Sequence, residues 1–223
     1  MIRKARENMR TYDTIIFDLD GTLLNTLEDL ADAVNYCMNR FGYPERTLEE
    51  VRCFVGNGIR KLMERATPEG AENADFEEIF QTFKEYYTEH CQIKTRAYPG
   101  IMDLLRKLDQ KKCRMAIVSN KNMEAVRELN EIYFSKYIKI AIGQREGVRK
   151  KPFPDSVNEA VRELDCDRAR VLYVGDSEVD KETADNAGVG CVLVSWGFRD
   201  RDMLSGLNPL SVIDRPEELL RFV

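Results

Sequence analysis

The amino-acid sequence predicts an α/β protein with a parallel β-sheet, helices on both faces of the sheet, and a helical unit inserted near the start. Two observations lead to this prediction. Short apolar runs rich in β-branched residues alternate with amphipathic helix patterns over most of the chain, and this alternation is typical of parallel sheets. The stretch between the first two apolar runs has no strand pattern and carries helix patterns alone.

Five apolar runs predict the strands of the sheet. They are nearly continuous in hydrophobic residues, as expected for strands covered on both faces. The runs cover residues 14–20, 114–120, 137–143, 170–176 and 190–196.

The inserted stretch predicts a bundle of four helices. Apolar residues recur at helical spacing in three segments: Leu27, Leu30, Val34, Cys37, Met38 and Phe41; Ile59, Leu62, Met63 and Ala66; Phe76, Ile79, Phe80, Phe83 and Tyr87. Thr47 and Glu50 have the spacing of a capping box and predict a short fourth helix. The turn sequence "AYPG" at 97–100 then marks the return to the sheet. We therefore expect a helical domain over residues 26–94 and a sheet domain over residues 1–25 and 95–223.

Composition argues against several classes of function. The 223 residues carry a net charge of −5 with basic and acidic residues interspersed, so no nucleic-acid partner is expected. No apolar run approaches the roughly 20 residues needed to cross a bilayer, so no membrane partner is expected either. The six cysteines form no C-x-x-C pair and indicate reduced thiols in a cytoplasmic protein. Residues 1–8 belong to no predicted element and are expected to form a frayed tail, which makes Met9 an adequate start.

Polar side chains gather where the predicted strands end. Asp18 and Asp20, Ser119, and Asp176 lie at three strand ends, and Asp180 follows one helical turn later. In a parallel sheet these ends share one crevice. Two carboxylates about 4 Å apart repel by about 4 kcal/mol at an effective dielectric constant near 20. The four carboxylates therefore predict a divalent cation, and oxygen ligands favour Mg2+.

The same residues could carry out phosphoryl transfer. One aspartate could attack phosphorus, its neighbour could protonate the leaving oxygen, and Lys151 with the cation could neutralise the phosphoryl oxygens. Ser119 could donate a hydrogen bond to phosphate. Gly21 permits a tight turn whose amide groups could hold an anion.

Three other hydrolytic chemistries fit the sequence less well. Because His90 is the single histidine, a Ser-His-Asp triad or a histidine-rich metal centre is not expected. "HCQIKTR" at 90–96 is similar to a cysteine-based phosphatase loop, but the Cys91 to Arg96 spacing is one residue short and the loop has no glycines. The alternative is that His90 and Cys91 simply end a helix.

Four motifs now resemble those of haloacid dehalogenase-like hydrolases: "DLDGT" (18–22), "SNK" (119–121), "KPFP" (151–154) and "GDSEVD" (175–180). Their order and separation match the family from about residue 12 onward. The resemblance implies a Rossmann-like core with an inserted four-helix cap domain. It implies that Asp18 is the nucleophile and Asp20 the general acid and base.

The resemblance also assigns the binding residues. Ser119 and Lys151 would bind phosphate, with Gly21, Thr22 and Asn120 beside them. Mg2+ would be held by the Asp18 carboxylate, the Asp20 backbone carbonyl and Asp176, with Asp180 orienting the waters of the metal. The expected partner is a small phosphorylated metabolite, and the protein would be a monomer or homodimer.

The cap sequence is similar to the phosphoglycolate phosphatase branch. "FVGNGIRKLMERA" (54–66) could present Gly58 amides or Arg60 to a substrate carboxylate. Pyrophosphatase, nucleotidase and sugar-phosphate phosphatase or mutase activities stay as alternatives within the family, and a catalytically silent binding or regulatory protein as one outside it.

For several of these residues, a purely structural role also stays open as an alternative. Gly58 could only make a turn with Arg60 in solvent, and Ser119 could only cap the following helix. Asp180 could be an exposed helix carboxylate, and Lys150 could take the place of Lys151.

Overall fold

The protein is described here by a computed structural model, which places residues 12–223; the tail expected over residues 1–8 lies outside this range. A six-stranded sheet has the order β5-β4-β1-β6-β7-β8, and every neighbouring pair in it is parallel. Its strands are β1 (Thr14–Phe17), β4 (Arg114–Asn122), β5 (Ile140–Gln144), β6 (Val171–Gly175), β7 (Gly190–Val194) and β8 (Ser211–Ile213). The predicted α/β fold with a parallel sheet is confirmed.

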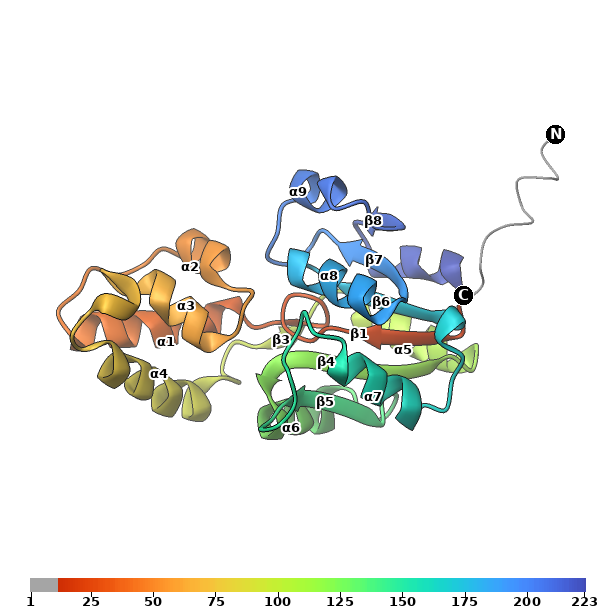
Figure 1. Ribbon diagram of the computed structural model, residues 1–223, viewed down its shortest axis with the longest axis horizontal. Coiled ribbons are helices and arrows are strands. Elements are labelled where there is room, and N and C mark those ends of the chain that lie inside the picture. The colour runs from red at the N-terminus through yellow and green to blue at the C-terminus, as the bar shows by residue number, and fades with distance from the viewer. Residues whose placement is uncertain (1–11) are drawn as a thin grey trace.

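Helices cover both faces of this sheet (Figure 1). One face packs against α5 (Ile101–Gln110), α6 (Met123–Tyr133) and the 3-10 helix η4 (Pro216–Phe222). The other packs against α7 (Asp155–Glu163), α8 (Glu178–Ala187) and α9 (Arg201–Gly206). A short 3-10 helix, η3 (Arg168–Arg170), precedes β6. Ile15 and Ile16 of β1 belong to the two different cores, because successive strand side chains point to opposite faces.

Four α-helices lie together at the other end of the molecule (Figure 1). They are α1 (Leu27–Arg40), α2 (Leu48–Phe54), α3 (Ile59–Ala66) and α4 (Phe76–His90), with the 3-10 helix η2 (Gly70–Glu72) between the last two. The apolar residues predicted to share helix faces form a hydrophobic core of their own, separate from the two cores of the sheet. The predicted capping box at Thr47 and Glu50 is also present. We call residues 27–90 the helical unit.

A two-stranded ribbon joins the helical unit to the sheet. β2 (Leu24–Asn25) pairs antiparallel with β3 (Arg96–Ala97), so the chain enters and leaves the unit side by side. The buried carboxylate of Asp29 at the start of α1 accepts hydrogen bonds from the backbone of Lys94 and Thr95. Both connections are therefore fixed to each other.

All five predicted runs differ in extent from the strands that they form, and β8 has no predicted counterpart. The run at 137–143 forms a strand only from Ile140, because Tyr137 and Ile138 are held in turns by backbone bonds to Phe134. β1 ends at Phe17, although the Asp18 amide still bonds to Val174 of β6 at 2.8 Å. Asp18 is therefore fixed at the carboxyl end of β1, while Asp20 lies in the turn that follows.

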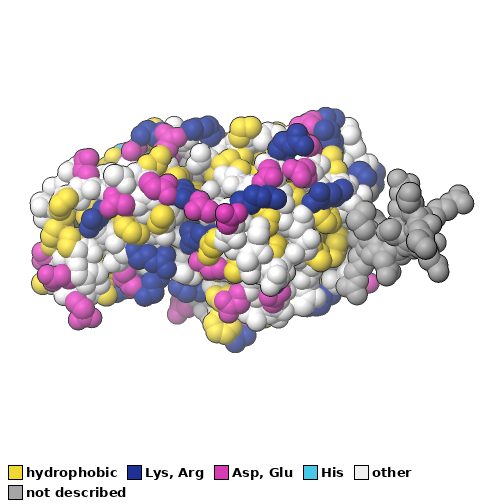
Figure 2. Space-filling model, turned by 90° about the horizontal axis from the view of Figure 1, so that it is seen from above, with side chains coloured by type: hydrophobic (Ala, Val, Ile, Leu, Met, Phe, Trp, Pro, Cys, Tyr) yellow, Lys and Arg dark blue, Asp and Glu magenta, His cyan; other side chains and the backbone are white. Residues whose placement is uncertain are grey.

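The charged side chains on one face and the character of the helices can be compared with the sequence predictions. On the face shown in Figure 2, basic and acidic side chains are interspersed and do not gather by sign. Among the helices of residues 12–223, we find none with both the length and the apolar character that a membrane crossing requires.

Candidate active site

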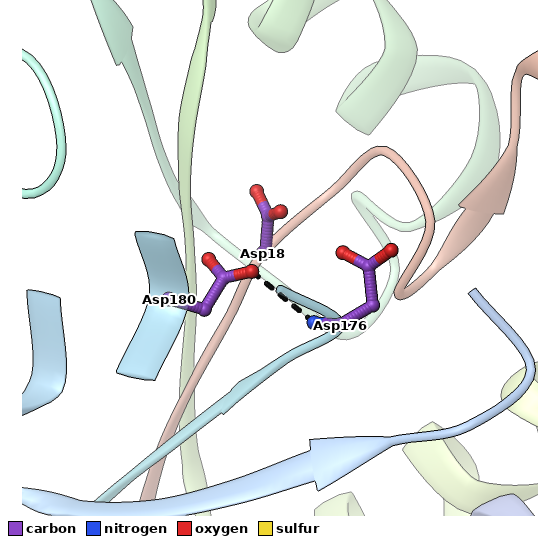
Figure 3. Close-up of side chains that lie close together, drawn as sticks. All are labelled: Asp18, Asp176 and Asp180. Carbon is purple, nitrogen blue, oxygen red and sulfur yellow. Dashed lines mark hydrogen bonds between the residues drawn. The ribbon is translucent and has the colours of Figure 1, made fainter. Parts of the chain in front are cut away.

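Three buried aspartates converge at the carboxyl ends of β1 and β6. Asp18 follows β1, Asp176 follows β6, and Asp180 lies in the first turn of α8. One carboxylate oxygen from each lies within 4.8 Å of the others. Figure 3 shows the three side chains arising from separate segments and pointing to the same side. The strand ends thus bring three of the four predicted carboxylates together, and Asp20 lies outside this group.

Two glycines make this close approach possible. Gly21 has φ 86°, and a Cβ there would lie 2.3 Å from Oδ2 of Asp176. A Cβ on Gly175 would lie 2.3 Å from the Asp180 side chain. Because real Cβ atoms do not approach so closely, any larger residue at either position would push a carboxylate away.

Asp180 is completely engaged by protein donors. Its Oδ1 accepts from Lys151 Nζ at 2.8 Å and Tyr173 OH at 3.1 Å. Its Oδ2 accepts from the backbone amides of Asp176 and Ser177 at 3.1 Å each and from Ser177 Oγ at 2.6 Å. The residue is 0% exposed, so the alternative of an exposed helix carboxylate is wrong. With these lone pairs in use, Asp180 is suited to holding its neighbours in place.

Lys151 lies between two of the aspartates. Its Nζ is 2.8 Å from Oδ1 of Asp18 and 2.8 Å from Oδ1 of Asp180, and the side chain is only 4% exposed. Asn120 fixes the backbone of Lys151 from both sides, since its side chain donates to the Lys151 carbonyl and accepts from the Lys151 amide. Lys150 is exposed, so the choice of Lys151 is supported by position.

Burial changes the proton affinity of this group. It raises the pKa of Asp18 to about 7; the Asp180 carboxylate adds to the rise and Lys151 opposes it. Burial also raises the pKa of Asp176 well above its usual range, and the nearby Asp180 and Asp18 carboxylates raise it further. One lysine therefore does not compensate the buried negative charge.

The residues fit a divalent cation. Within residues 12–223, Oδ2 of Asp18 and Oδ1 of Asp176 have no hydrogen-bond donor, while Oδ2 of Asp176 accepts from the Phe198 amide at 2.7 Å. Carboxylate oxygens without protein donors, on two residues whose pKa values are raised, are suited to a hard cation such as Mg2+.

Asp20 points to a different partner from Asp18. Its Oδ1 lies 3.1 Å from Nζ of Lys121, which also donates to the hydroxyl of Tyr87 at 2.8 Å. Asp20 does not belong to the cluster of three carboxylates. The two aspartates of the "DLD" sequence are thus divided between two lysines.

Hydroxyl groups complete the rim of the site. Ser119 is buried, and its Oγ accepts from the Lys121 amide at 3.1 Å. The helix that follows is capped by Asn122, whose side chain accepts from the Glu124 amide, so the alternative that Ser119 caps it is wrong. The buried Thr22 hydroxyl has no partner among the described residues, like the hydroxyls of Thr26, Thr67 and Thr95.

The structure does not bring Arg60 to these residues. The contacts that we find for its guanidinium are Glu64, Glu77 and the rings of Phe76 and Phe80, all in the helical unit. Gly58 has φ 83° and starts α3 in a turn with open space around it. The alternative of a turn with an exposed arginine matches this geometry, and a substrate contact by either residue stays a prediction.

Sequence reasoning missed the residues that join the helical unit to the site. Lys121 and Tyr87 do so at Asp20. Arg199 donates to the Val55 carbonyl at 2.7 Å, and Arg52 donates to the Phe198 carbonyl at 2.9 Å. For Lys121, the sequence feature that could have indicated this role is its place in the "SNK" motif. For Arg199, it is its place in the loop after β7.

Cys91 does not form a phosphatase loop. It directly follows α4 as the C-cap, and burial raises the pKa of its thiol. Arg96 pairs with Glu28. The alternative that His90 and Cys91 simply end a helix is confirmed.

The chain matches a known protein family over most of its length. A model of the family described as haloacid dehalogenase-like hydrolase matches residues 15–194. Phosphoglycolate phosphatase of Pseudomonas putida is 34% identical over 212 residues, which cover 92% of this chain and 78% of the relative. The enzyme of that name from Vibrio parahaemolyticus is 33% identical over 216 residues, which cover 94% and 95%.

A solved structure is also similar to this chain over most of its length. The crystal structure of a Lactobacillus delbrueckii subsp. bulgaricus protein, provisionally called a phosphoglycolate phosphatase, superposes with a TM-score of 0.90 at 36% identity. The superposition covers 94% of this chain and 97% of that one.

Proposed function

The chain belongs to the haloacid dehalogenase-like hydrolases and is a phosphomonoester hydrolase, and from this premise we propose that it is a Mg2+-dependent phosphatase acting on 2-phosphoglycolate. Support for the substrate comes from relatives at 33 to 34% identity that carry this name and that the alignment covers over most of their length. We also propose that the enzyme is cytoplasmic and acts as a monomer or homodimer on a small phosphorylated metabolite.

The main support for the proposed chemistry is that Asp18 and Asp20 pair with two different lysines. Asp18 is held by Lys151, next to Oδ1 of Asp176, which has no hydrogen-bond donor among the described residues. Asp20 is held by Lys121 outside that cluster. One carboxylate is therefore placed to be a nucleophile beside a lysine and the bound cation. The other is free to carry a proton.

The reaction would proceed in two steps. An oxygen of Asp18 attacks phosphorus, the bond from phosphorus to the bridging oxygen breaks, and Asp20 gives its proton to the departing oxygen. Asp20 then takes a proton from water as the water attacks the aspartyl phosphate, which releases phosphate and restores Asp18. Lys151, Ser119 and backbone amides near Gly21 would hold the phosphoryl oxygens throughout.

Bound Mg2+ would supply charge neutralisation at the phosphoryl oxygens. Asp18, Asp176 and the Asp20 backbone carbonyl would hold the ion. Asp180 belongs to this proposal as the residue that fixes Lys151 and the Asp176 backbone, since its own oxygens already accept protein donors. Thr22 and Asn120 would complete the phosphate site, the first through its free hydroxyl and the second through the Lys151 backbone.

The helical unit would act as the cap over this site. We propose that residues 26–94 form a cap domain on a core made of residues 1–25 and 95–223. Its separate hydrophobic core and its paired connections support this division. A closed cap would exclude water from the aspartyl phosphate and control product release.

Phosphate release from a panel of substrates tests the proposal. We expect 2-phosphoglycolate to exceed pyrophosphate, nucleoside monophosphates and sugar phosphates in kcat/KM, and we expect chelation of divalent cations to abolish turnover. Preference for another compound would reassign the substrate within the family, and no cleavage of any would favour a binding or regulatory protein.

Substitution of the nucleophile tests the mechanism. Asp18→Asn should lower kcat by at least about a thousandfold, because no aspartyl phosphate can form. Circular dichroism should show an unchanged fold, since the amide occupies the same volume. Turnover near the wild-type rate would refute the role given to Asp18.

A further inference from the structure

The contact between Lys121 and Tyr87 joins the helical unit to the sheet beside Asp20. Lys121 lies near the end of β4 and Tyr87 in the last turn of α4. The lysine Nζ donates to the tyrosine hydroxyl at 2.8 Å and lies 3.1 Å from Oδ1 of Asp20. The ammonium also lies 4.8 Å from the centre of the tyrosine ring. A single charge therefore touches both parts of the protein.

Both side chains are buried at this contact. The side chain of Lys121 is 8% exposed and Tyr87 is 6% exposed. A buried ammonium is costly unless it is paired and hydrogen-bonded. The Asp20 carboxylate and the Tyr87 hydroxyl provide this pairing for Lys121. Burial raises the pKa of Tyr87 to about 12, so its hydroxyl keeps its proton.

Each of the two groups has a donor left over. An ammonium has three N–H bonds, and among residues 12–223 only Asp20 and Tyr87 accept from this one. The tyrosine oxygen accepts from Lys121, and its own O–H has no acceptor among the same residues. Two unused donors are thus available here: one on the ammonium, 3.1 Å from Asp20, and one on the tyrosine hydroxyl, 2.8 Å from the ammonium.

The leaving group of the substrate must lie at the same place. To protonate the bridging oxygen, Asp20 must approach it to about 3 Å. In 2-phosphoglycolate the carboxylate is one methylene from that oxygen. A group about 3 Å from Asp20 is therefore within hydrogen-bond reach of the carboxylate. Arg60, the cation expected from the sequence, is instead held by glutamates and aromatic rings within the helical unit.

We propose that Lys121 and Tyr87 together bind a carboxylate on the leaving group, and so select phosphomonoesters whose alcohol is anionic. This inference rests on the proposed function and names the residues that would give the phosphatase its substrate specificity. It also makes substrate recognition depend on the position of the helical unit, since Tyr87 meets Lys121 only when α4 lies against the end of β4.

The test compares two substrates that differ only in this charge. 2-Phosphoglycolate and 2-hydroxyethyl phosphate share the phosphate and the first methylene, but the second has a neutral alcohol. The quantity measured is the ratio of their kcat/KM values. Lys121→Met and Tyr87→Phe are the test variants. Lys84→Met is the matched control, because Lys84 lies on α4 with its ammonium over the Phe80 ring.

Loss of a hydrogen bond to a charged group corresponds to about 10- to 100-fold. We expect Lys121→Met to lower the ratio by that amount and Tyr87→Phe to lower it less. Both substrates are expected to react more slowly in Lys121→Met, because Asp20 loses its partner, so the ratio is the informative quantity. Lys84→Met should keep the wild-type ratio.

A binding measurement separates this inference from the proposed function. 3-Phosphonopropionate replaces the bridging oxygen of phosphoglycolate with a methylene and cannot be hydrolysed, and propylphosphonate is its neutral counterpart. Calorimetric titration of both, with Mg2+, should show a preference for the carboxylate that Lys121→Met removes.

The outcomes are distinct. Equal losses for charged and neutral ligands in Lys121→Met would overturn the inference and leave the phosphatase proposal intact. If the wild type released no phosphate from phosphoglycolate, the proposed substrate would fail. The titration would then decide the inference alone, and equal binding of the two phosphonates by the wild type would overturn it.

Discussion

At the scale of single residues, the main feature is a buried carboxylate whose pKa is raised by its surroundings. Burial raises the pKa of Asp18 to about 7, whereas an aspartate in the unfolded chain has a pKa of about 4. The folded, metal-free protein therefore holds this proton more tightly than the unfolded chain does. The raised pKa of Asp18 therefore adds to the free energy of unfolding below about pH 4, and this contribution is lost as the pH rises to about 7.

This gives a prediction about Mg2+ and pH. Because the cation competes with the proton, saturating Mg2+ should raise the Tm more near pH 8 than near pH 5. Differential scanning fluorimetry with and without chelator measures the difference. Asp18→Asn, which has no proton to exchange, should show a smaller dependence on pH. An equal rise at both pH values in the wild type would contradict the link between Asp18 and the metal.

The sequence predicted the residues of the carboxylate cluster but not the partners of Asp20. Asp18, Asp176 and Asp180 come after recognisable strands, so the sheet topology alone brings them together. Lys121 belongs to the "SNK" motif near the end of β4, but the motif does not show which side chains it contacts. Its significance depends on Tyr87, which is 34 positions away, and local patterns carry no information on such a contact.

At the scale of the elements, the start of α8 connects stability to the site. Ser177 is the N-cap, and it forms a capping box with Asp180: its Oγ donates to Asp180 Oδ2 and the Asp180 amide bonds back to it. The same carboxylate holds Lys151. One helix terminus therefore positions a residue of the phosphate site.

Ser177→Ala should lower both stability and activity. The lost cap costs about 1 kcal/mol of the free energy of unfolding, and the freed Asp180 oxygen should also move Lys151 and lower kcat. Thr47→Ala is the matched control, because Thr47 forms a capping box with Glu50 on α2, away from the carboxylates. Denaturant unfolding and steady-state kinetics together check the pair. Equal kinetic losses in the two variants would show that the effect of Ser177 is only on stability.

The longer strands and helices were predictable from periodicity, and the short ones were not. β8 has three residues and the ribbon of β2 and β3 has two in each strand. Such lengths carry too few positions for an alternating pattern. They form because neighbouring elements provide an edge to pair with, which is a property of the assembled sheet.

At the scale of the whole molecule, two arginines cross between the helical unit and the sheet domain. Arg52 of α2 donates to the Phe198 carbonyl and pairs with Asp200, while Arg199 donates to the Val55 carbonyl and pairs with Glu178. These contacts hold the helical unit against the loop after β7.

Weakening one of these contacts should loosen closure. Arg52→Gln removes the ion pair with Asp200 and weakens the bond to the Phe198 carbonyl. We expect faster amide hydrogen exchange in the loop after β7 and a several-fold higher KM, with a smaller change in kcat. Arg65→Gln is the control, since Arg65 donates to the Phe54 carbonyl within the helical unit. Unchanged exchange in the Arg52 variant would show that other contacts maintain closure.

The ribbon of β2 and β3 also makes the protein modular. Because Asn25 pairs directly with Arg96, the two chain positions that bound the insertion are already neighbours, and a two-residue hairpin turn could connect them. A chain shortened in this way would keep Asp18, Asp20, Asp176 and Lys151 while losing Tyr87. In evolution, the same junction would allow one hydrolytic core to exchange its lid for another without rebuilding the sheet. Catalysis and substrate choice would then be inherited as separable parts.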